Sequence, residues 1–210
     1  MKKLTVTGKT VEAAVEEALR RLGATRDQVE ISVLEEASRG FLGWIGSREA
    51  KVEVKLIPTP LEQGLSFLRS VLDRMGLKSV RLEVKEEPEH TWILLSGDHL
   101  GMLIGRRGQT LDALQYLVNV AAHRNAGPYT RIVLDAQGYR ERRRQTLMGL
   151  ADRIAEKVTA TGSPLSLEPM NPMERKVIHT RIQQKHAGVV TYSEGEDPRR
   201  HVVVAPKTDR

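Results

Sequence analysis

The sequence predicts an α+β protein built from three small domains. The chain has 210 residues, which exceeds the roughly 100–150 residues of the commonest single domain. Segments with apolar residues at helical spacing are interspersed with short segments in which apolar and polar residues alternate, as in half-buried strands. A stiff stretch, Ile57-Pro58-Thr59-Pro60, marks the first boundary. We expect domains at residues 1–57, 62–137 and 138–210, with a linker at 58–61.

The first domain is expected to be a βαββ unit. Alternating patterns predict strands at Lys3–Val6, Val29–Leu34 and Ala50–Leu56. Thr10 is a suitable N-cap for a helix after the first strand, and Gly23 is a suitable left-handed residue at the end of that helix.

Glycines at every third position mark the segment between the second and third strands, Arg39-Gly40-Phe41-Leu42-Gly43-Trp44-Ile45-Gly46. An irregular hairpin connection and a partner-binding loop both fit this pattern. Loops that keep large apolar residues are often functional. The candidate contact residues for a partner are Arg39, Phe41 and Trp44.

The second domain is expected to have the element order αββααβ. Thr59, Pro60 and Glu62 supply an N-cap, a proline at the first helical position and a capping-box acid. The elements that follow are strands at Ser79–Glu86 and His90–Ser96, helices at Asp98–Ile104 and Gln109–Ala122, and a strand at Arg131–Asp135. The apolar residues of the longer helix, Leu117 among them, are expected to face inward.

The third domain is expected to be an α/β domain with a small sheet. Its elements are a helix at Tyr139–Thr159, a short strand at Leu165–Glu168, a helix from the N-cap Asn171 to about His186, and a hairpin of Val189–Ser193 and His201–Ala205. The Asn171-Pro172-Met173-Glu174 sequence is typical of a helix start.

The positive charge is concentrated in the last third of the chain. The net charge is +6, and residues 136–210 supply +5 of it. Such a segment favours a polyanionic partner. Only eight residues are aromatic, so we expect contacts to a nucleic-acid backbone more than base stacking. The supporting basic residues are Arg140, Arg142, Arg143, Arg144, Arg181, Lys185, Arg199 and Arg200.

The tetrapeptide Gly105-Arg106-Arg107-Gly108 lies between two predicted helices. Glycines let the backbone turn sharply and approach a sugar-phosphate chain, and the arginines add positive charge there. The domain resembles a type II KH domain, whose GxxG loop clamps about four nucleotides of a single strand. The resemblance implies that these four residues bind RNA. Ile104, Leu111 and Leu114 fit a groove or, better, the core, and Asp112, Gln115 and Asn119 fit a solvated face or a base-reading one.

A second motif, Arg175-Lys176-Val177-Ile178-His179, places Arg175 and His179 on one helical face. An arginine there can bind a phosphate and an imidazole can stack or donate beside it. A solvated charged face is the alternative. With the Thr191-Tyr192-Ser193 and Arg199-Arg200-His201 segments, this motif resembles an R-three-H domain, which binds single-stranded nucleic acid.

The order of the three domains resembles the bacterial Jag family, also called KhpB or SpoIIIJ-associated. The resemblance implies a cytoplasmic protein that binds single-stranded RNA, with single-stranded DNA as an alternative ligand. It also implies an RNA chaperone or post-transcriptional regulator that acts with a small single-KH protein or membrane-associated cell-wall or insertion machinery. Links to cell shape, elongation, peptidoglycan homeostasis and sporulation belong to the same implication. Only about four residues, Ile57–Pro60, stand where the family often has a long charged linker.

Other classes of function are less well supported by the sequence. The chain lacks cysteine, a Walker lysine, a dinucleotide-binding fingerprint and an HExxH pair, so we expect no catalytic activity, cofactor or metal. No apolar run approaches the roughly 18–20 residues of a membrane span. A scaffold that docks on a protein partner or an anionic membrane surface through its basic last third is the alternative.

Overall fold

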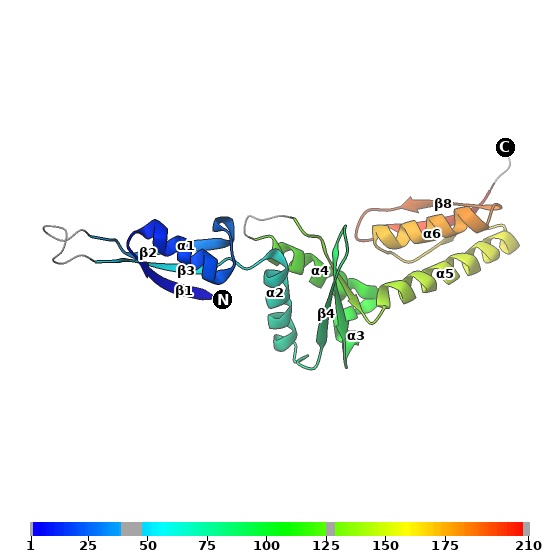
Figure 1. Ribbon diagram of the computed structural model, residues 1–210. Coiled ribbons are helices and arrows are strands. Elements are labelled where there is room, and N and C mark those ends of the chain that lie inside the picture. The colour runs from blue at the N-terminus through cyan, green and yellow to red at the C-terminus, as the bar shows by residue number, and fades with distance from the viewer. Residues whose placement is uncertain (1, 39–47, 125–128, 208–210) are drawn as a thin grey trace. The chain divides into compact units, whose positions relative to one another are not determined.

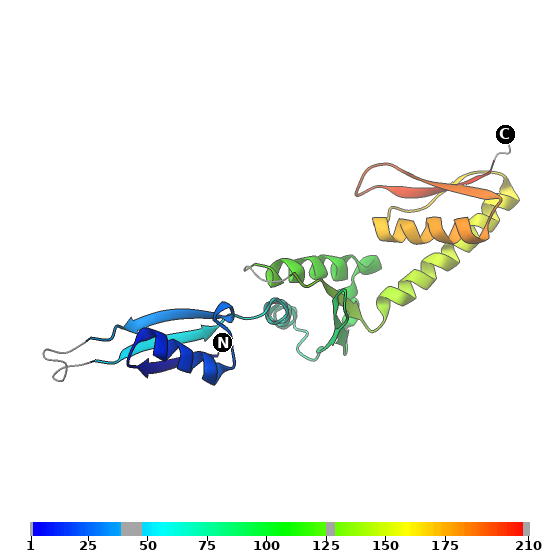
Figure 2. The same ribbon diagram turned by 45° about the horizontal axis from the view of Figure 1, so that its top comes forward.

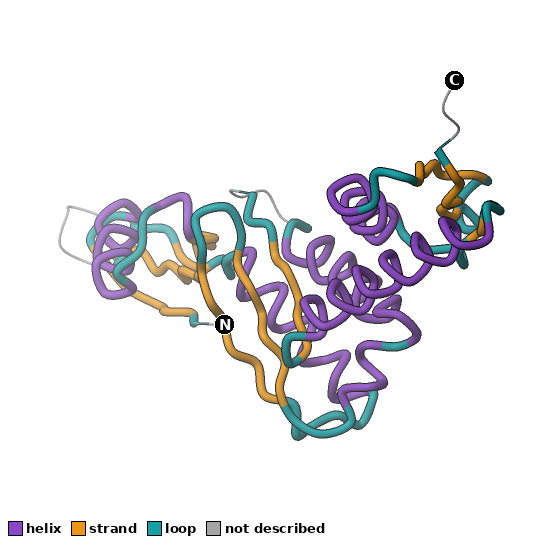
Figure 3. Tube along the Cα trace, turned by 90° about the vertical axis from the view of Figure 1, so that its right-hand side faces the viewer, coloured by secondary structure: helices purple, strands orange, loops and turns teal. Residues whose placement is uncertain are grey.

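The computed structural model describes residues 2–38, 48–124 and 129–207. Helices and strands follow one another along this part of the chain (Figures 1 and 3). Within it the strands form three small sheets, with the orders β1-β3-β2, β4-β5-β6 and β7-β9-β8. The predicted α+β class with small sheets is therefore confirmed.

The first sheet belongs to a βαββ unit. Its elements are β1 (Lys3–Gly8), α1 (Val11–Leu22), a 3-10 turn η1 (Arg26–Gln28), β2 (Val29–Glu35) and β3 (Ala50–Leu56). Strand β3 is central and antiparallel to both neighbours. Helix α1 lies along one face of the sheet (Figure 2), and its Ala14, Val15 and Ala18 are buried in a core with Val52 and Val54.

The caps predicted for α1 are confirmed. The Ala13 N–H donates to Oγ1 of Thr10 over 3.1 Å, and Gly23 ends the helix with a φ of 64°. The predicted loop residues Arg39, Phe41 and Trp44 lie outside the described residues.

The second sheet is mixed, with the predicted element order αββααβ. Its elements are α2 (Pro60–Arg74), β4 (Arg81–Glu86), β5 (Thr91–Ser96), α3 (Leu100–Ile104), a 3-10 turn η2 (Arg106–Gly108), α4 (Gln109–Ala122) and β6 (Ile132–Ala136). Strand β5 is antiparallel to β4 and parallel to β6. The predicted capping box also forms, because the Thr59 N–H donates to Glu62 and the Glu62 N–H donates to the Thr59 hydroxyl.

One inward-facing side chain of α4 was predicted wrongly. Leu117 is 47% exposed, whereas Leu111, Leu114 and Val118 are buried. Residues 111, 114 and 118 form one helical stripe, and Gln115 completes it, since its Oε1 accepts a hydrogen bond from the Leu134 N–H of β6 over 3.0 Å. Leu117 is apolar but lies off this stripe.

The third sheet packs with two helices. The elements are α5 (Tyr139–Thr161), β7 (Leu165–Ser166), α6 (Pro172–Lys185), β8 (Val189–Glu194) and β9 (His201–Pro206). Strands β8 and β9 form the predicted antiparallel hairpin, and β7 pairs with the other edge of β9. Helices α5 and α6 lie side by side (Figures 1 and 2). Leu147, Ala151, Ile178 and Val204 are among the side chains buried in the core of this domain.

Candidate nucleic-acid interface

The Gly105-Arg106-Arg107-Gly108 loop joins α3 to α4 through left-handed backbone. The φ angle is 68° at Gly105, 54° at Arg107 and 81° at Gly108. A side chain at Gly105 would collide with Thr110, and a Cβ atom at Gly108 would lie 2.7 Å from Cε1 of Tyr139. Both ends of the loop therefore require glycine.

The two arginines of the loop differ in what they contact. Arg106 is exposed, and its side chain makes no hydrogen bond or ion pair with the residues described. Arg107 forms an ion pair with Glu168, and its Nη1 donates to the Pro169 carbonyl over 3.4 Å. Arg106 is thus free to contact a phosphate. Arg107 could bind a phosphate only after its ion pair with Glu168 is broken.

The start of α5 is anchored to the end of β6. Asp135 is buried, and its carboxylate accepts hydrogen bonds from the N–H groups of Gly138 (2.6 Å) and Arg140 (3.0 Å). Gln137 and Gly138 have φ angles of 50° and 72°, so the chain turns tightly between strand and helix. A carboxylate at a helix N-terminus also interacts favourably with the helix dipole.

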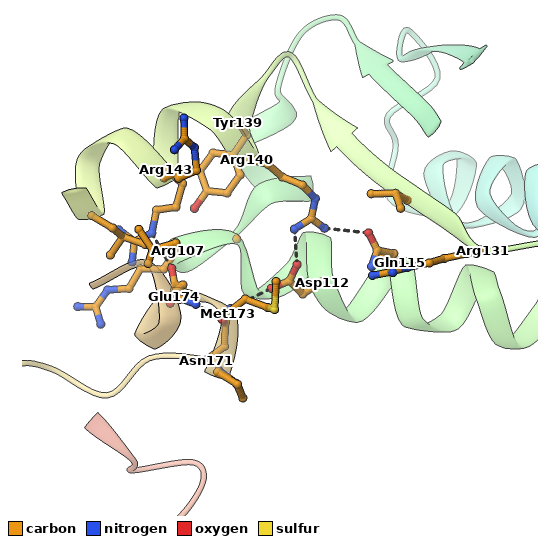
Figure 4. A pocket seen from close by; sticks show the side chains of 16 residues that line it. Arg107, Asp112, Gln115, Arg131, Tyr139, Arg140, Arg143, Asn171, Met173 and Glu174 are labelled. Atoms are coloured by element: carbon orange, nitrogen blue, oxygen red, sulfur yellow. Dashed lines mark hydrogen bonds and ion pairs between the residues drawn. The ribbon is translucent and has the colours of Figure 1, made fainter. Parts of the chain in front are cut away.

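Arg140 is fully engaged within the fold. Its Nε donates to the Leu134 carbonyl (2.7 Å), and its Nη2 donates to Oε1 of Gln115 (3.0 Å). Its Nη1 lies 2.9 Å from the Asp112 carboxylate (Figure 4). Arg140 was predicted to support binding, and Asp112 and Gln115 to face solvent or bases. The structure instead joins all three in one network that holds α4, β6 and α5 together.

The other arginines near the start of this helix, Arg142, Arg143 and Arg144, also have partners. They are the Gln137 carbonyl for Arg142, Glu174 for Arg143 and Glu141 for Arg144. The Arg143 and Glu174 side chains are only 22% and 11% exposed, whereas Arg144 is 52% exposed. The arginines at 140–144 are therefore all engaged within the fold, and Arg144 is the most exposed of the three that form ion pairs.

A pocket of about 570 Å³ lies where the GxxG loop meets the first turns of α5 and α6 (Figure 4). The residues that line it include Arg107, Gly108, Tyr139, Arg143, Asn171 and Met173. Asn171 Nδ2 donates to the Asp112 carboxylate over 3.3 Å. Burial raises the pKa of the Tyr139 phenol, so this ring is neutral at physiological pH. The sequence did not indicate the pocket, because its walls come from segments far apart in the chain.

Arg175 of the second motif is buried. Only 7% of the residue is exposed, and its Nη1 donates to the Met170 carbonyl (2.9 Å) and to Asp197 (3.3 Å). This is neither the solvated face nor the open phosphate-binding face that the helical spacing suggested. The segment before α6 and the β8–β9 turn supply these contacts, and sequence spacing along one helix could not reveal them.

His179 is held between two hydroxyl groups of β8. Its Nδ1 lies 2.7 Å from Oγ1 of Thr191, and its Nε2 lies 2.9 Å from Oγ of Ser193. Burial, and secondarily the charge of Arg175, lower the pKa of His179. The ring is therefore neutral near pH 7, with one nitrogen donating and the other accepting. The Thr-Tyr-Ser segment thus has a structural use, which is to fix this ring.

Basic residues with free charges remain on the third domain. Lys185, Arg199 and Arg200 are exposed, and their side chains have no partner in the described ranges. Arg181, in contrast, forms an ion pair with Asp152 (2.6 Å). Of the predicted supporting residues, Lys185, Arg199 and Arg200 are thus both exposed and unpaired within the described ranges.

Comparisons with known proteins match the whole architecture. Family models match the Jag N-terminus at residues 6–56, the KhpA/KhpB KH domain at 65–134 and the R-three-H domain at 145–206. The RNA-binding protein KhpB of Clostridium symbiosum is 44% identical over 210 residues, which are 100% of this chain and 94% of that protein. The chain belongs to the KhpB family. The RNA-binding protein KhpB of Bacillus subtilis (strain 168) is 37% identical over 208 residues, covering 99% of this chain and 100% of that protein.

In this KhpB-family chain both motifs fall inside matched domains. The GxxG loop lies within the KH match, and Arg175 and His179 lie within the R-three-H match. Glu168, Tyr139 and Met173 were not singled out from the sequence. An acidic residue just before a predicted basic helix is the signal that could have drawn attention to Glu168.

Metal clusters and membrane spans are absent from the described part of the chain. Among those residues no cluster of three or more His, Asp or Glu side chains is arranged to hold a metal ion. No helix that the structure describes is long and apolar enough to cross a membrane.

Proposed function

We propose that this KhpB-family chain binds single-stranded RNA through the GxxG loop, with the exposed basic residues of its third domain holding a neighbouring stretch. The observation that supports this most is the loop itself. Two glycines that admit no side chain bring the backbone close to a ligand, and the unpaired Arg106 between them supplies charge. Its curated relatives are named RNA-binding proteins.

The two proposed sites differ in the number of unpaired basic side chains that they offer to RNA. The GxxG loop offers the unpaired Arg106 and Arg107, which is paired with the exposed carboxylate of Glu168. The third domain offers Lys185, Arg199 and Arg200. Arg175 and His179 act in this proposal by shaping their domain, and His179 by presenting a neutral ring. Two weak sites on one chain bind more tightly than either alone, because the first contact raises the effective concentration of the second.

Reversing the charge of Arg106 tests the loop. Arg106→Asp is expected to weaken binding of a single-stranded RNA about tenfold, equivalent to about 1.4 kcal/mol, because an acid repels phosphate. Fluorescence anisotropy with a labelled mixed-sequence RNA gives the affinity. Arg69→Asp in α2 is the matched control, since Arg69 is also exposed, has no partner within the described chain and changes the net charge equally.

The same comparison distinguishes RNA binding through the loop from the alternative function as a scaffold. Equal affinities for the two variants would show that the loop is not the binding surface. In that case binding of both variants to anionic vesicles or to a protein partner would support a scaffold that docks through its basic last third. Thermal unfolding of Arg106→Asp should match the wild type, because the side chain makes no hydrogen bond or ion pair within the described residues.

The physiological role is inferred from family resemblance. We propose a cytoplasmic RNA chaperone or post-transcriptional regulator that works with a small single-KH protein or with membrane-associated cell-wall machinery. Its proposed effects are on cell shape, elongation, peptidoglycan homeostasis and sporulation. Deleting the gene and restoring either the wild type or Arg106→Asp tests this, because a role through RNA requires that only the wild type restores cell shape.

A further inference from the structure

The pocket between the GxxG loop and the third domain has a charge that suits a polyanion. Five arginines line it, against the two carboxylates Asp112 and Glu174. Arg140 and Arg143 are paired with those two carboxylates. The remaining positive charge comes from Arg107, Arg131 and Arg144, whose own partners, where they have any, do not line the pocket.

The pocket is continuous with the loop. Arg107 and Gly108 belong to both, so a strand whose backbone leaves the Gly105–Gly108 loop on this side enters the pocket directly. Its volume of about 570 Å³ falls within the range of about 300–1,000 Å³ that is usual for small-ligand sites. One nucleotide fits such a space.

The walls also offer surfaces for a base. Tyr139 is neutral and packs against Gly108. Met173, at the start of α6, is 71% exposed and lines the pocket. RNA-binding proteins hold unstacked bases on aromatic rings and guanidinium planes. The pocket thus combines a cationic rim with side chains against which a base can lie (Figure 4).

Glu168 occupies the position that a phosphate would take. Its carboxylate pairs with Arg107, and its side chain is 71% exposed while that of Arg107 is 43% exposed. An exposed ion pair of this kind contributes little to stability, so a phosphate can replace it at small cost. The Arg143–Glu174 pair is much less exposed and forms a fixed part of the wall.

We propose that this pocket binds one nucleotide of the RNA strand beyond the GxxG loop, and that Glu168 competes with its phosphate for Arg107. The inference rests on the proposed RNA binding. It assigns a ligand to the junction between the KH match, which ends at residue 134, and the R-three-H match, which begins at residue 145. It also makes Glu168 an internal competitor that weakens binding.

The test separates the pocket from the loop by RNA length. Oligouridylates of about four nucleotides, the span of a GxxG loop, and of about eight nucleotides are titrated against the full chain. Binding is followed by the amide NMR signals of Gly105 and Gly108, which report weak as well as tight complexes. Met173→Glu is the main variant, because an acid in the first turn of α6 is compatible with the helix dipole but would repel a phosphate in the pocket.

Met173→Glu is expected to weaken binding of the longer RNA about fivefold, as one nearby like charge does, and to leave the shorter RNA unaffected. Gln183→Glu is the control, since it adds the same charge at an exposed position of α6 outside the pocket. Glu168→Gln is expected to tighten binding of the longer RNA about threefold, because the competing charge is removed.

Failure of the pocket assignment and failure of the proposed function would give different results. If Met173→Glu bound the longer RNA as Gln183→Glu does, or if Glu168→Gln failed to tighten it, the pocket assignment would be overturned while the proposed function stood. If the wild type bound neither RNA, the proposed function itself would fail.

Discussion

Two constraints act together on Gly108. Its φ of 81° is unfavourable for any residue with a side chain, and the ring of Tyr139 leaves too little room for a Cβ atom. The loop that carries Arg106 is thereby held in one conformation by its own backbone and by helix α5. This rigidity reduces the entropy lost when the loop binds a strand.

Gly108→Ala is expected to lower the free energy of unfolding by about 2–3 kcal/mol, because strained backbone and a steric clash add. Urea denaturation followed by circular dichroism measures the change. Gly101→Ala in α3 is the control, since a Cβ there meets no atom within 4 Å. That control should change the stability by less than about 1 kcal/mol, and equal losses in the two variants would contradict the proposed constraint.

Residue types and spacing predicted which residues form the loop but not how the charges pair. Gly105 and Gly108 were identified because a GxxG pattern has a local meaning. Arg140 was not recognised as structural, because its partners Asp112 and Leu134 lie in other elements. Burial of Arg175 depends likewise on a carbonyl and a carboxylate outside its helix. Pairing across elements is a property of the fold and not of the local sequence.

Among the elements, α5 and α6 are joined by one carboxylate. Asp152 of α5 accepts hydrogen bonds from Arg181 of α6 (2.9 and 2.6 Å) and lies 2.9 Å from Nε2 of His186. Arg181, and then His186, hold the pKa of Asp152 far below its usual range. The cluster fixes the packing of the two helices at a point close to the end of α6.

Asp152→Asn is expected to destabilise the protein at neutral pH, and the difference from the wild type should shrink in acid. A carboxylate whose pKa is lower in the folded state stabilises the fold above its unfolded pKa of about 4. That contribution is lost as the pH falls below this value, toward the lowered folded pKa. The urea midpoints of wild type and variant should therefore differ at pH 7 and converge as the pH drops below about 4. Parallel curves at all pH values would show that the charge of Asp152 is not responsible.

Element boundaries were largely predictable because helix caps are local. Thr10, Thr59 and Asn171 were each identified before a helix, and each accepts the capping hydrogen bond. The strand predicted at 165–168 was too long, since β7 comprises Leu165 and Ser166, although the Leu167 N–H still donates to the Val202 carbonyl of β9 over 2.8 Å. Strand length depends on the partner strand, which lies elsewhere in the chain.

For the whole molecule, the number of basic residues overstates the number of charges that are free to meet a ligand. Arginines such as Arg140 and Arg143 are paired with the carboxylates of Asp112 and Glu174. The exposed charges on Arg106, Lys185, Arg199 and Arg200 should dominate the response to salt. Affinity for single-stranded nucleic acid falls with salt at a log–log slope of about −0.7 for each phosphate contacted.

Arg106→Gln is therefore expected to make this slope shallower by about 0.7, because one phosphate contact is lost. Arg140→Gln should leave the slope unchanged but reduce the stability, since Asp112 and the Leu134 carbonyl lose a partner. Affinities measured between low and physiological salt give both slopes. A slope that flattens equally in the two variants would mean that Arg140 reaches the ligand despite its internal contacts.

The junction of β6 and α5 bears on how such chains are assembled in evolution. Asp135 and Arg140 tie the last strand of one domain to the first turn of the next, and residues 135–144 fall in neither domain match. A recombination event that exchanged the third domain at residue 137 would remove Arg140 and leave the Leu134 carbonyl of β6 without its guanidinium partner. We therefore expect the unit exchanged in evolution to extend past the end of the sheet, so that the first turn of α5 is inherited together with the KH domain.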